Sequence, residues 1–242
     1  MRIATWNLNN RVGKVKFRPE AAAAAVALNA DLIAFNEFYP RENEQAFRAV
    51  LSDAGLVHQV LSAASPGDTA NRVLVASRLE LEQVELEVPA IDVHLPANVL
   101  GVRVKAEGLD VVALRVPAYA GTDAPLLGKA WDWLTSLADR LRLQPAVLIG
   151  DFNAGPASSA SRGGAHLRAM LANGWHRASA AKPTFFGNSG VSSEIDHVLA
   201  TTLCELTHPV VVTEVGGLRL ADAPGAISDH AALVCEVKVA TG

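Results

Sequence analysis

The chain has 242 residues, of which 50% are hydrophobic and 19% are charged, and its mean hydropathy is +0.21. This composition excludes an intrinsically disordered chain, and the length suits one compact unit of sandwich or barrel size, so we expect a single domain over residues 1–242. The net charge of -4 is spread evenly over the two halves of the chain, which excludes a basic arm of the kind that indicates nucleic-acid binding.

Short apolar runs rich in valine, isoleucine and leucine recur along the chain and predict about eleven strands. In chain order they span 2–6, 31–35, 56–61, 72–77, 83–88, 98–105, 109–116, 145–149, 194–200, 207–213 and 231–239. Helical periodicity appears at 19–29, 43–54 and 123–143, and weakly at 162–173. Many strands and few helices predict an α+β sandwich of two packed sheets with helices outside them.

The cysteine content and the apolar runs bear on the compartment. Cys204 and Cys235 have neither a disulfide-framework nor a metal-type spacing, so we expect two reduced core residues. No run reaches the roughly 18 apolar residues that a membrane span needs. The first residues do not have the pattern of a signal peptide, because residues 2–6 already have the pattern of a strand. We therefore expect a cytoplasmic monomer without membrane insertion.

Five short motifs follow one another in a suggestive order. They are TWNLN with Asn7, DLIAFNE with Glu37, GDFN with Asp151 and Asn153, EIDH with Asp196, and SDH with Asp229 and His230. Four of the five close an apolar run or lie just beyond one, where polar side chains stand at the rim of a sheet. This is the pattern of an active site.

The side chains of these motifs predict a chemistry. Glutamate, aspartate and asparagine offer oxygen ligands, which suit Mg²⁺ first and Mn²⁺ second, rather than zinc. Such ions keep several waters and bind carboxylates together with substrate phosphate, so metal-assisted phosphoryl hydrolysis is the predicted reaction. Asp196 is the carboxylate expected to orient the imidazole of His230.

Each motif also has a simpler interpretation. Asn7 could be a turn residue that bonds its own backbone, Glu37 a solvated strand end, and His230 a structural histidine. Asp151 and Asn153 are harder to dismiss, because their alternate spacing brings both to one face of the chain. The five motifs together, in this order, favour a catalytic site.

These residues resemble the endonuclease/exonuclease/phosphatase superfamily over nearly the whole chain, from Thr5 to His230. GDFN at 150–153 and SDH at 228–230 stand as that family has them, with TWN at 5–7 and SEIDH at 193–197 close behind. The run RVLVASR at 72–78 is similar to an internal strand of the family. The resemblance implies a four-layer α/β sandwich of two mostly antiparallel sheets flanked by helices.

The resemblance also implies roles for individual residues. A divalent metal would be held chiefly by Glu37, with Asn7 close by and Asp229 sharing the coordination. Asp151 would activate the attacking water or protonate the leaving oxygen, and Asn153 would hold the phosphate. His230, oriented by Asp196, would stabilise the transition state or act as the base, and both assignments stay open.

Two positions depart from the family pattern. Asn36 precedes Glu37 where glutamine is frequent. Arg115 ends the strand at 109–116, where relatives carry tyrosine or histidine. A guanidinium at this place can bind two phosphate oxygens, so we expect Arg115 to contact the scissile phosphate. The alternative is a salt bridge to a carboxylate such as Asp151.

Other substrate contacts are less marked in the sequence. Lys14 and Lys16 lie in a basic loop near Asn7, and Arg162 follows GDFN, so all three are candidate phosphate contacts, although such a loop is often only solvated. Thr184-Phe185-Phe186 is similar to the Thr-Phe-Trp region of abasic-site enzymes, but the tryptophan is absent.

Three functions are compatible with this pattern. The leading one is a metal-dependent phosphodiester hydrolase that acts on DNA or RNA. The second is a phosphatase or phosphodiesterase for a small or lipid-derived phosphate. The third is a catalytically silent binding module, against which the completeness of the motif set argues.

Overall fold

The structure is a computed structural model that describes residues 1–10, 12, 17–64, 71–89, 91–92, 94–119, 124–159 and 163–240. The helices are α1 (Glu20–Ala27), α2 (Glu44–Asp53), α3 (Ala124–Leu141) and α4 (Gly164–Ala172). The longer strands are β1 (Arg2–Asn7), β2 (Leu32–Phe38), β3 (His58–Leu61), β4 (Arg72–Ser77), β5 (Leu81–Val84), β6 (Val99–Val104), β7 (Leu109–Arg115), β8 (Ala146–Asp151), β12 (Asp196–Thr201), β13 (Cys204–Val212) and β16 (Ala232–Val239). The short ones are β9 (Trp175–Arg177), β10 (Phe185–Phe186), β11 (Ser192–Ser193), β14 (Glu214–Val215) and β15 (Leu218–Arg219).

Two six-stranded sheets form the centre of the molecule. Their strand orders are β13-β16-β1-β2-β4-β3 and β5-β6-β7-β8-β12-β9. Each sheet has one parallel pair, β1 with β2 and β7 with β8, and its other pairs are antiparallel. The prediction of two mostly antiparallel sheets is confirmed. Because the central pair of each sheet is parallel, both strands of that pair end at the same rim of their sheet.

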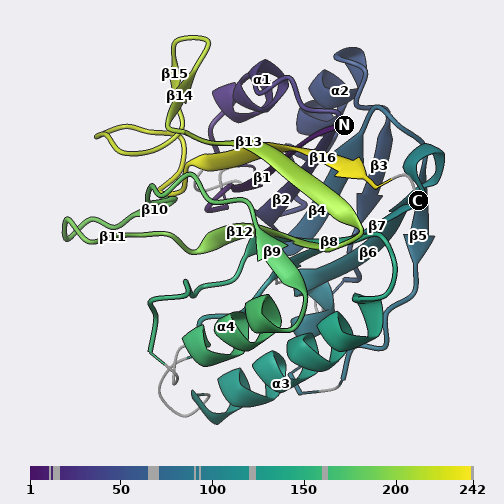
Figure 1. Cartoon of the computed structure of the whole chain (residues 1–242). Helices are drawn as coiled ribbons and strands as arrows, with labels where there is room; N and C mark the ends of the chain where they lie inside the picture. Colours follow the sequence, from purple (N-terminus) through teal and green to yellow (C-terminus); the bar gives the residue numbers. More distant parts are fainter. Residues whose placement is uncertain are drawn as a thin grey trace.

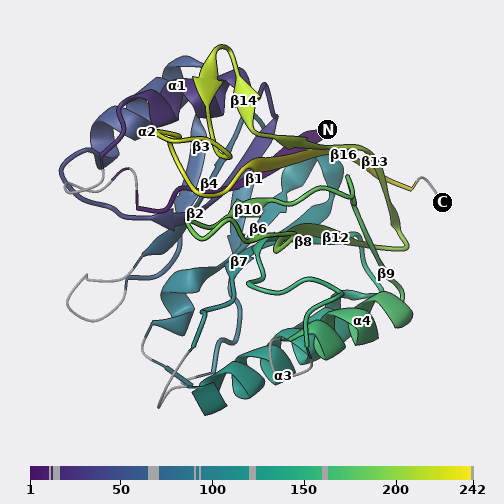
Figure 2. The same cartoon turned by 90° about the vertical axis from the view of Figure 1, so that its left-hand side faces the viewer.

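Helices cover the outer face of each sheet, so that the molecule has four layers (Figures 1 and 2). α1 and α2 lie over the first sheet, and α3 and α4 lie over the second. Three apolar clusters fill the spaces between the layers: one beneath α1 and α2, one between the sheets, and one beneath α3 and α4. The expected sandwich flanked by helices is therefore confirmed.

The sequence explains this layering. In β1, Ile3 joins the core between the sheets, whereas Ala4 and Trp6 face the helices, as the two-residue period of a strand requires. The alanines of α1 allow this helix to pack closely on its sheet. In α3, Trp131, Leu134 and other apolar residues at helical spacing form the buried face.

The short strands escaped prediction, because two or three residues carry no measurable periodicity. Four of the short strands form two hairpins, β10 with β11 and β14 with β15, which project on the same side of the molecule, at the left of Figure 1. The run at 83–88 also differs from its prediction, since the strand there is Leu81–Val84. Its partner β6 ends opposite Leu81, and this pairing sets the boundary.

The two cysteines are free and buried, as predicted. Burial raises the pKa of the Cys235 thiol to about 12, which keeps it protonated and unreactive at neutral pH. None of the helices in the described ranges combines the length and the hydropathy needed to cross a membrane.

Candidate active site

The motif residues meet where strands of both sheets end. Asn7 closes β1 and Asp151 closes β8, and the Asn7 Nδ2 atom donates to Asp151 Oδ2 at 3.0 Å across the gap between the sheets. Arg115 closes β7 in register with Asp151, and Asp196 opens β12 in register with the same residue. Side chains that are far apart in the sequence thus share one rim.

Glu37 reaches the rim through an irregularity in its strand. The register between β2 and β4 shifts between Phe35 and Phe38, and Glu37 has a φ of 50°. A bulge of this kind redirects one side chain, and a positive φ costs a residue other than glycine about 1–3 kcal/mol. The surrounding pairing stabilises this conformation, which turns the carboxylate toward Asn7 at 3.5 Å.

Arg115 lies between two carboxylates of the site. Its Nη2 atom is 3.0 Å from Glu37 Oε1, and its Nε atom is 3.7 Å from Asp151 Oδ2. The Nε atom is buried and has no hydrogen-bond partner among the described residues. The salt bridge considered from the sequence is thus present, although its shorter contact is with Glu37 rather than with Asp151.

The backbone before Asp151 is held closely by its neighbours. Gly150 has a φ of 143°, and a Cβ atom there would collide with the carbonyl oxygen of Leu114. Asn36 is completely buried beside it, where its Oδ1 atom accepts the Asp151 N–H at 3.1 Å and its Nδ2 atom donates to Leu114 O at 2.9 Å. Asn36 therefore links the two sheets beneath the site.

Asn153 bonds to its surroundings through its nitrogen atoms. Its backbone N–H donates to Asp151 Oδ1 at 2.8 Å, and its Nδ2 atom donates to Val116 O at 2.7 Å and to Asp151 Oδ2 at 3.3 Å. Its φ is 50°, a conformation that asparagine tolerates better than most residues. In this arrangement Asn153 orients the Asp151 carboxylate.

His230 and Asp196 form a buried pair. The ring atom Nδ1 lies 2.8 Å from Asp196 Oδ2, and the backbone N–H of Asp196 donates to Thr184 Oγ1 at 3.0 Å. Trp6 holds the other side of the histidine by donating to its carbonyl oxygen at 2.9 Å. The ring of Phe185 packs against the imidazole, with the ring centres 5.1 Å apart.

Asp229 has its own partners. Asn9 Nδ2 donates to Asp229 Oδ1 at 2.7 Å. Ser228 Oγ donates to Asn7 O at 2.8 Å and accepts the His230 N–H at 3.1 Å. The serine of the SDH motif therefore joins the last segment of the site to the first.

The protonation states of the central pair follow from burial and from the charges nearby. Burial raises the pKa of Asp151 to about 6, and the charge of Asp196 acts in the same direction. Burial alone would lower the pKa of His230, but the charge and hydrogen bond of Asp196, helped by Asp151 and Asp229, raise it to about 9. At neutral pH the site therefore holds a carboxylate at Asp151 beside an imidazolium at His230.

The donor set suits a hard divalent cation. Glu37 and Asp151 present carboxylate oxygens that Asn7 bridges, and oxygen is the ligand that Mg²⁺ and Mn²⁺ prefer. The ligand atoms of Asp151, Asp196 and His230 also lie within 4.8 Å of one another. A protonated imidazole cannot ligate, however, so the Glu37 side fits a cation better. The Asn7 side chain turns its NH₂ group, rather than its oxygen, toward these carboxylates, because its Oδ1 atom accepts the Asn9 N–H at 2.9 Å.

Three predicted contacts lie outside the described residues. These are Lys14, Lys16 and Arg162, the candidate phosphate contacts of the two loops. Sequence reasoning in turn missed Asn9, Asn10 and Ser228. The signal for Asn9 and Asn10 was the density of asparagine in NLNN at 7–10, and the signal for Ser228 was its place in the SDH motif.

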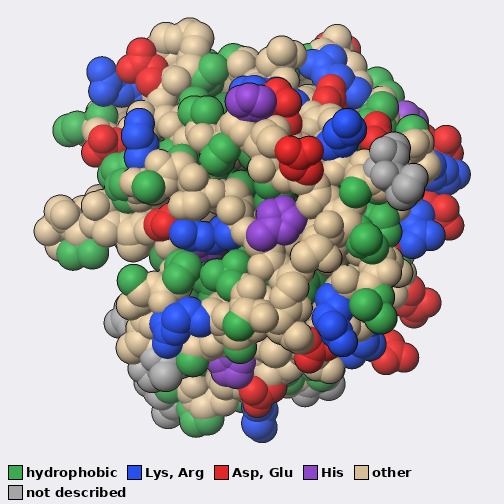
Figure 3. All heavy atoms as spheres, in the orientation of Figure 1, with side chains coloured by type: hydrophobic (Ala, Val, Ile, Leu, Met, Phe, Trp, Pro, Cys, Tyr) green, Lys and Arg blue, Asp and Glu red, His purple; other side chains and the backbone are tan. Residues whose placement is uncertain are grey.

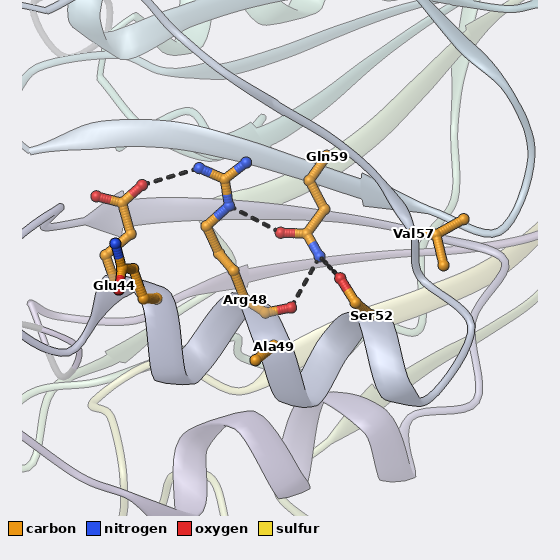
Figure 4. Close-up of a pocket in the computed structure, with 7 residues that line it drawn as sticks. Glu44, Arg48, Ala49, Ser52, Val57 and Gln59 are labelled. Atoms are coloured by element: carbon orange, nitrogen blue, oxygen red, sulfur yellow. Dashed lines mark hydrogen bonds and ion pairs between the residues drawn. The ribbon is translucent and has the colours of Figure 1, made fainter.

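Another hollow on the surface is lined by none of the candidate site residues. A cavity of about 490 Å³ lies between α2 and β3 (Figure 4). Arg48 bonds there to Glu44 and to Gln59, both at 2.9 Å, and Gln59 bonds to Ser52 at 3.0 Å. Since these polar groups satisfy one another, the hollow has the character of an ordinary surface depression.

Comparison with known proteins identifies the family of the chain. The sequence model of the Endonuclease/Exonuclease/phosphatase family matches residues 4–230. The match confirms the resemblance that the motifs indicated. No curated protein matches the chain.

Several solved structures share the fold. The 3′ phosphatase NExo from Neisseria, bound to a product DNA hairpin, is 22% identical, with 98% of each chain covered and a TM-score of 0.75. An AP endonuclease from Archaeoglobus fulgidus is 21% identical, with 99% of this chain and 100% of the other covered and a TM-score of 0.72. A mannosyl-6-phosphatase from Bacteroides thetaiotaomicron is 17% identical, with 98% and 99% covered and a TM-score of 0.64. Identities this low establish the shared fold alone.

Proposed function

The chain belongs to the endonuclease/exonuclease/phosphatase family, and we propose that it is a divalent-metal-dependent phosphodiester hydrolase that cleaves nucleic acid. One observation carries the proposal: Glu37, Asp151 and the His230–Asp196 pair converge at a single rim. A carboxylate that is ionised at neutral pH and an imidazolium stand side by side there. This combination suits general acid–base hydrolysis of a phosphate ester.

The protonation states support one division of roles between Asp151 and His230. Asp151 accepts a proton from the attacking water, whose oxygen forms the new bond to phosphorus. The bond from phosphorus to the leaving oxygen then breaks, and His230 donates its proton to that oxygen. Asp196 holds the imidazolium in place, and Asn153 keeps the Asp151 carboxylate aimed.

A divalent cation, Mg²⁺ or Mn²⁺, would be held by Glu37, with Asp151 and Asp229 as further carboxylates of the site. When bound, it supplies Lewis-acid polarisation of the phosphoryl oxygen. Arg115 binds a second phosphate oxygen through its fork of donors. Its Nε atom is buried 3.7 Å from Asp151 Oδ2 and has no hydrogen-bond partner among the described residues, which supports this role.

Two features favour nucleic acid over a small substrate. The β10–β11 hairpin projects beyond the sheets (Figure 1). Its first residue, Phe185, pairs with His230 through a β-bridge. An aromatic ring next to the acid and a projecting hairpin suit a polymer that extends past the reacting phosphate. Among proteins of the same fold, the 3′ phosphatase from Neisseria is bound to a product DNA hairpin, and another protein is named an AP endonuclease.

The charge distribution favours the second candidate, a phosphatase or phosphodiesterase for a small or lipid-derived phosphate. The net charge is -4, and acidic and basic side chains are interspersed on the face that Figure 3 shows. A polyanion gains little from such a surface. The mannosyl-6-phosphatase shows that the fold also carries this type of activity.

The test is hydrolysis of supercoiled plasmid, abasic duplex, RNA, inositol phosphates and a generic phosphodiester, with and without Mg²⁺ or Mn²⁺. Metal-dependent cleavage of a nucleic acid that is lost in Glu37→Ala supports the proposal. Turnover of the small phosphates alone would replace it with the second candidate. No turnover of any substrate would favour a catalytically silent binding module.

A further inference from the structure

Both carboxylate oxygens of the proposed metal ligand Glu37 are held by other groups of the chain. Oε1 lies 3.0 Å from Arg115 Nη2 and 3.5 Å from Asn7 Nδ2, and Oε2 lies 3.1 Å from Asn10 Nδ2. The Arg115 and Glu37 side chains are 19% and 15% exposed, so water screens their attraction only in part. The guanidinium thus supplies positive charge at the place where a cation would bind.

A divalent cation and this guanidinium compete for the negative charge of Glu37. Two positive groups on one carboxylate would lie within a few ångströms of each other, and Coulomb repulsion at that separation is strong in a half-buried site. A cation that binds Glu37 therefore has to displace Arg115, or it has to bind more weakly than the carboxylates alone would allow.

Arg115 has a second place to bind within its reach. Its Nε atom is buried without a hydrogen-bond partner among the described residues, and it already lies 3.7 Å from Asp151 Oδ2. A phosphate under attack beside Asp151 would offer two oxygens to the planar fork, which is the geometry that arginine prefers.

We propose that Arg115 is an exchangeable counter-ion, which neutralises Glu37 until a divalent cation binds and then transfers its contact to the substrate phosphate. The inference rests on the proposed function and adds a coupling to it. Phosphate draws Arg115 away from Glu37 and so favours the cation, and the cation frees Arg115 and so favours phosphate. Linkage requires the two effects to be equal.

The coupling is measured without turnover, by Mn²⁺ titration followed by electron paramagnetic resonance of the free ion. Arg115→Met removes the competing charge, so we expect it to bind Mn²⁺ about fivefold tighter or more than the wild type, within the usual range of coupling between sites. The matched control is Arg177→Met, which breaks a half-buried pair with Glu194 at 2.7 Å and leaves Glu37 untouched. We expect its Mn²⁺ affinity to equal that of the wild type.

A second titration uses inorganic phosphate as the probe. In the wild type, saturating phosphate should tighten Mn²⁺ binding by a larger factor than in Arg115→Met, because only the wild type has an arginine to release. Direct contact between cation and phosphate contributes to both proteins, so the difference between the two factors isolates Arg115.

Three outcomes would overturn the exchange. Arg115→Met could melt like the wild type yet bind Mn²⁺ no tighter, Arg177→Met could tighten binding equally, or phosphate could act equally on both proteins. If Arg115→Met does not fold, Arg115→Gln keeps a polar side chain without the charge and carries the same expectation. The metal-dependent function fails separately, if neither the wild type nor the arginine variant binds Mn²⁺, or if Glu37→Gln binds it as well as the wild type.

Discussion

The Nδ1 atom of His230 lies 2.8 Å from the Oδ2 atom of Asp196, whose side chain is completely buried. The bond fixes the orientation of the ring, and the charge of Asp196 raises the pKa of the imidazole. The other ring nitrogen, Nε2, has no hydrogen-bond partner among the described residues, so it is the atom that is free to donate a proton.

Replacing Asp196 by asparagine tests this pair. The amide keeps the shape but loses the charge, so His230 should release its proton at a lower pH. We expect turnover at neutral pH to fall about 10–100-fold, part of the 10²–10⁴-fold that acid–base assistance supplies. Steady-state kinetics measures the change, and Asp139→Asn on α3 is the control. Unchanged turnover in Asp196→Asn would show that the pair is only structural.

The pH dependence of turnover follows from the two shifted groups. Asp151, with its pKa raised to about 6 by burial, must be ionised to accept a proton. His230, with its pKa raised to about 9 by its acidic neighbours, must be protonated to donate one. The kcat/KM of the enzyme should therefore rise through about pH 6 and fall above about pH 9. A rate that keeps rising through pH 9 would mean that the imidazole acts as the base.

Glu37→Ala should abolish the response to metal. It removes the carboxylate best placed for the cation, so activity should become independent of added Mg²⁺ and fall to a low level. Titration of activity with MgCl₂ measures this, and Glu107→Ala, in an exposed turn, should respond like the wild type. A Glu37→Ala protein that still follows the Mg²⁺ concentration would move the metal site to other residues.

Gly150→Ala should destabilise the fold beneath the site. The new methyl group would meet the backbone of Leu114, which cannot rotate away, and the φ of 143° is unfavourable for alanine. We expect the free energy of unfolding to fall by about 3 kcal/mol or more from strain and overpacking. Gly108→Ala is the matched control, because it also has a positive φ but lies in open space, and it should lose only about 1 kcal/mol. Urea unfolding distinguishes the two losses.

His197 should make stability depend on pH. Burial lowers its pKa from 6.5 to about 4, and its Nε2 atom lies 2.8 Å from Ala154 O. Between pH 6.5 and about 4, His197 binds a proton in the unfolded chain but stays neutral in the folded chain. The stability present above pH 6.5 is therefore lost as the pH falls toward 4, by about 3 kcal/mol.

His197→Gln keeps a donor for Ala154 but does not titrate, so the stability difference between the two proteins isolates this term. Asp151, whose folded pKa is raised, contributes with the opposite sign over part of the same window, but it does so in both proteins. Urea unfolding at pH 7, 5.5 and 4.5 gives the comparison. Parallel pH curves would contradict the assignment of a neutral, buried His197.

The long elements were predictable because their patterns are local. The runs at 72–77 and 145–149 coincide with β4 and closely with β8, and 123–143 contains α3. The bulge at Glu37 and the two-residue strands were not predictable. A bulge results from pairing with another strand, and a two-residue strand exists only through its partner.

The longer strands and helices, the family and the chemical types of the site residues followed from the sequence, since periodicity and motif spacing are properties of the chain itself. Which of those residues touch became known from the tertiary structure. It placed Arg115 on Glu37, turned the Asn7 amide toward two carboxylates, and brought Asn9, Asn10 and Asn36 into the site. These contacts join strands of different sheets, and their charges act through space, so no local pattern of residues encodes them.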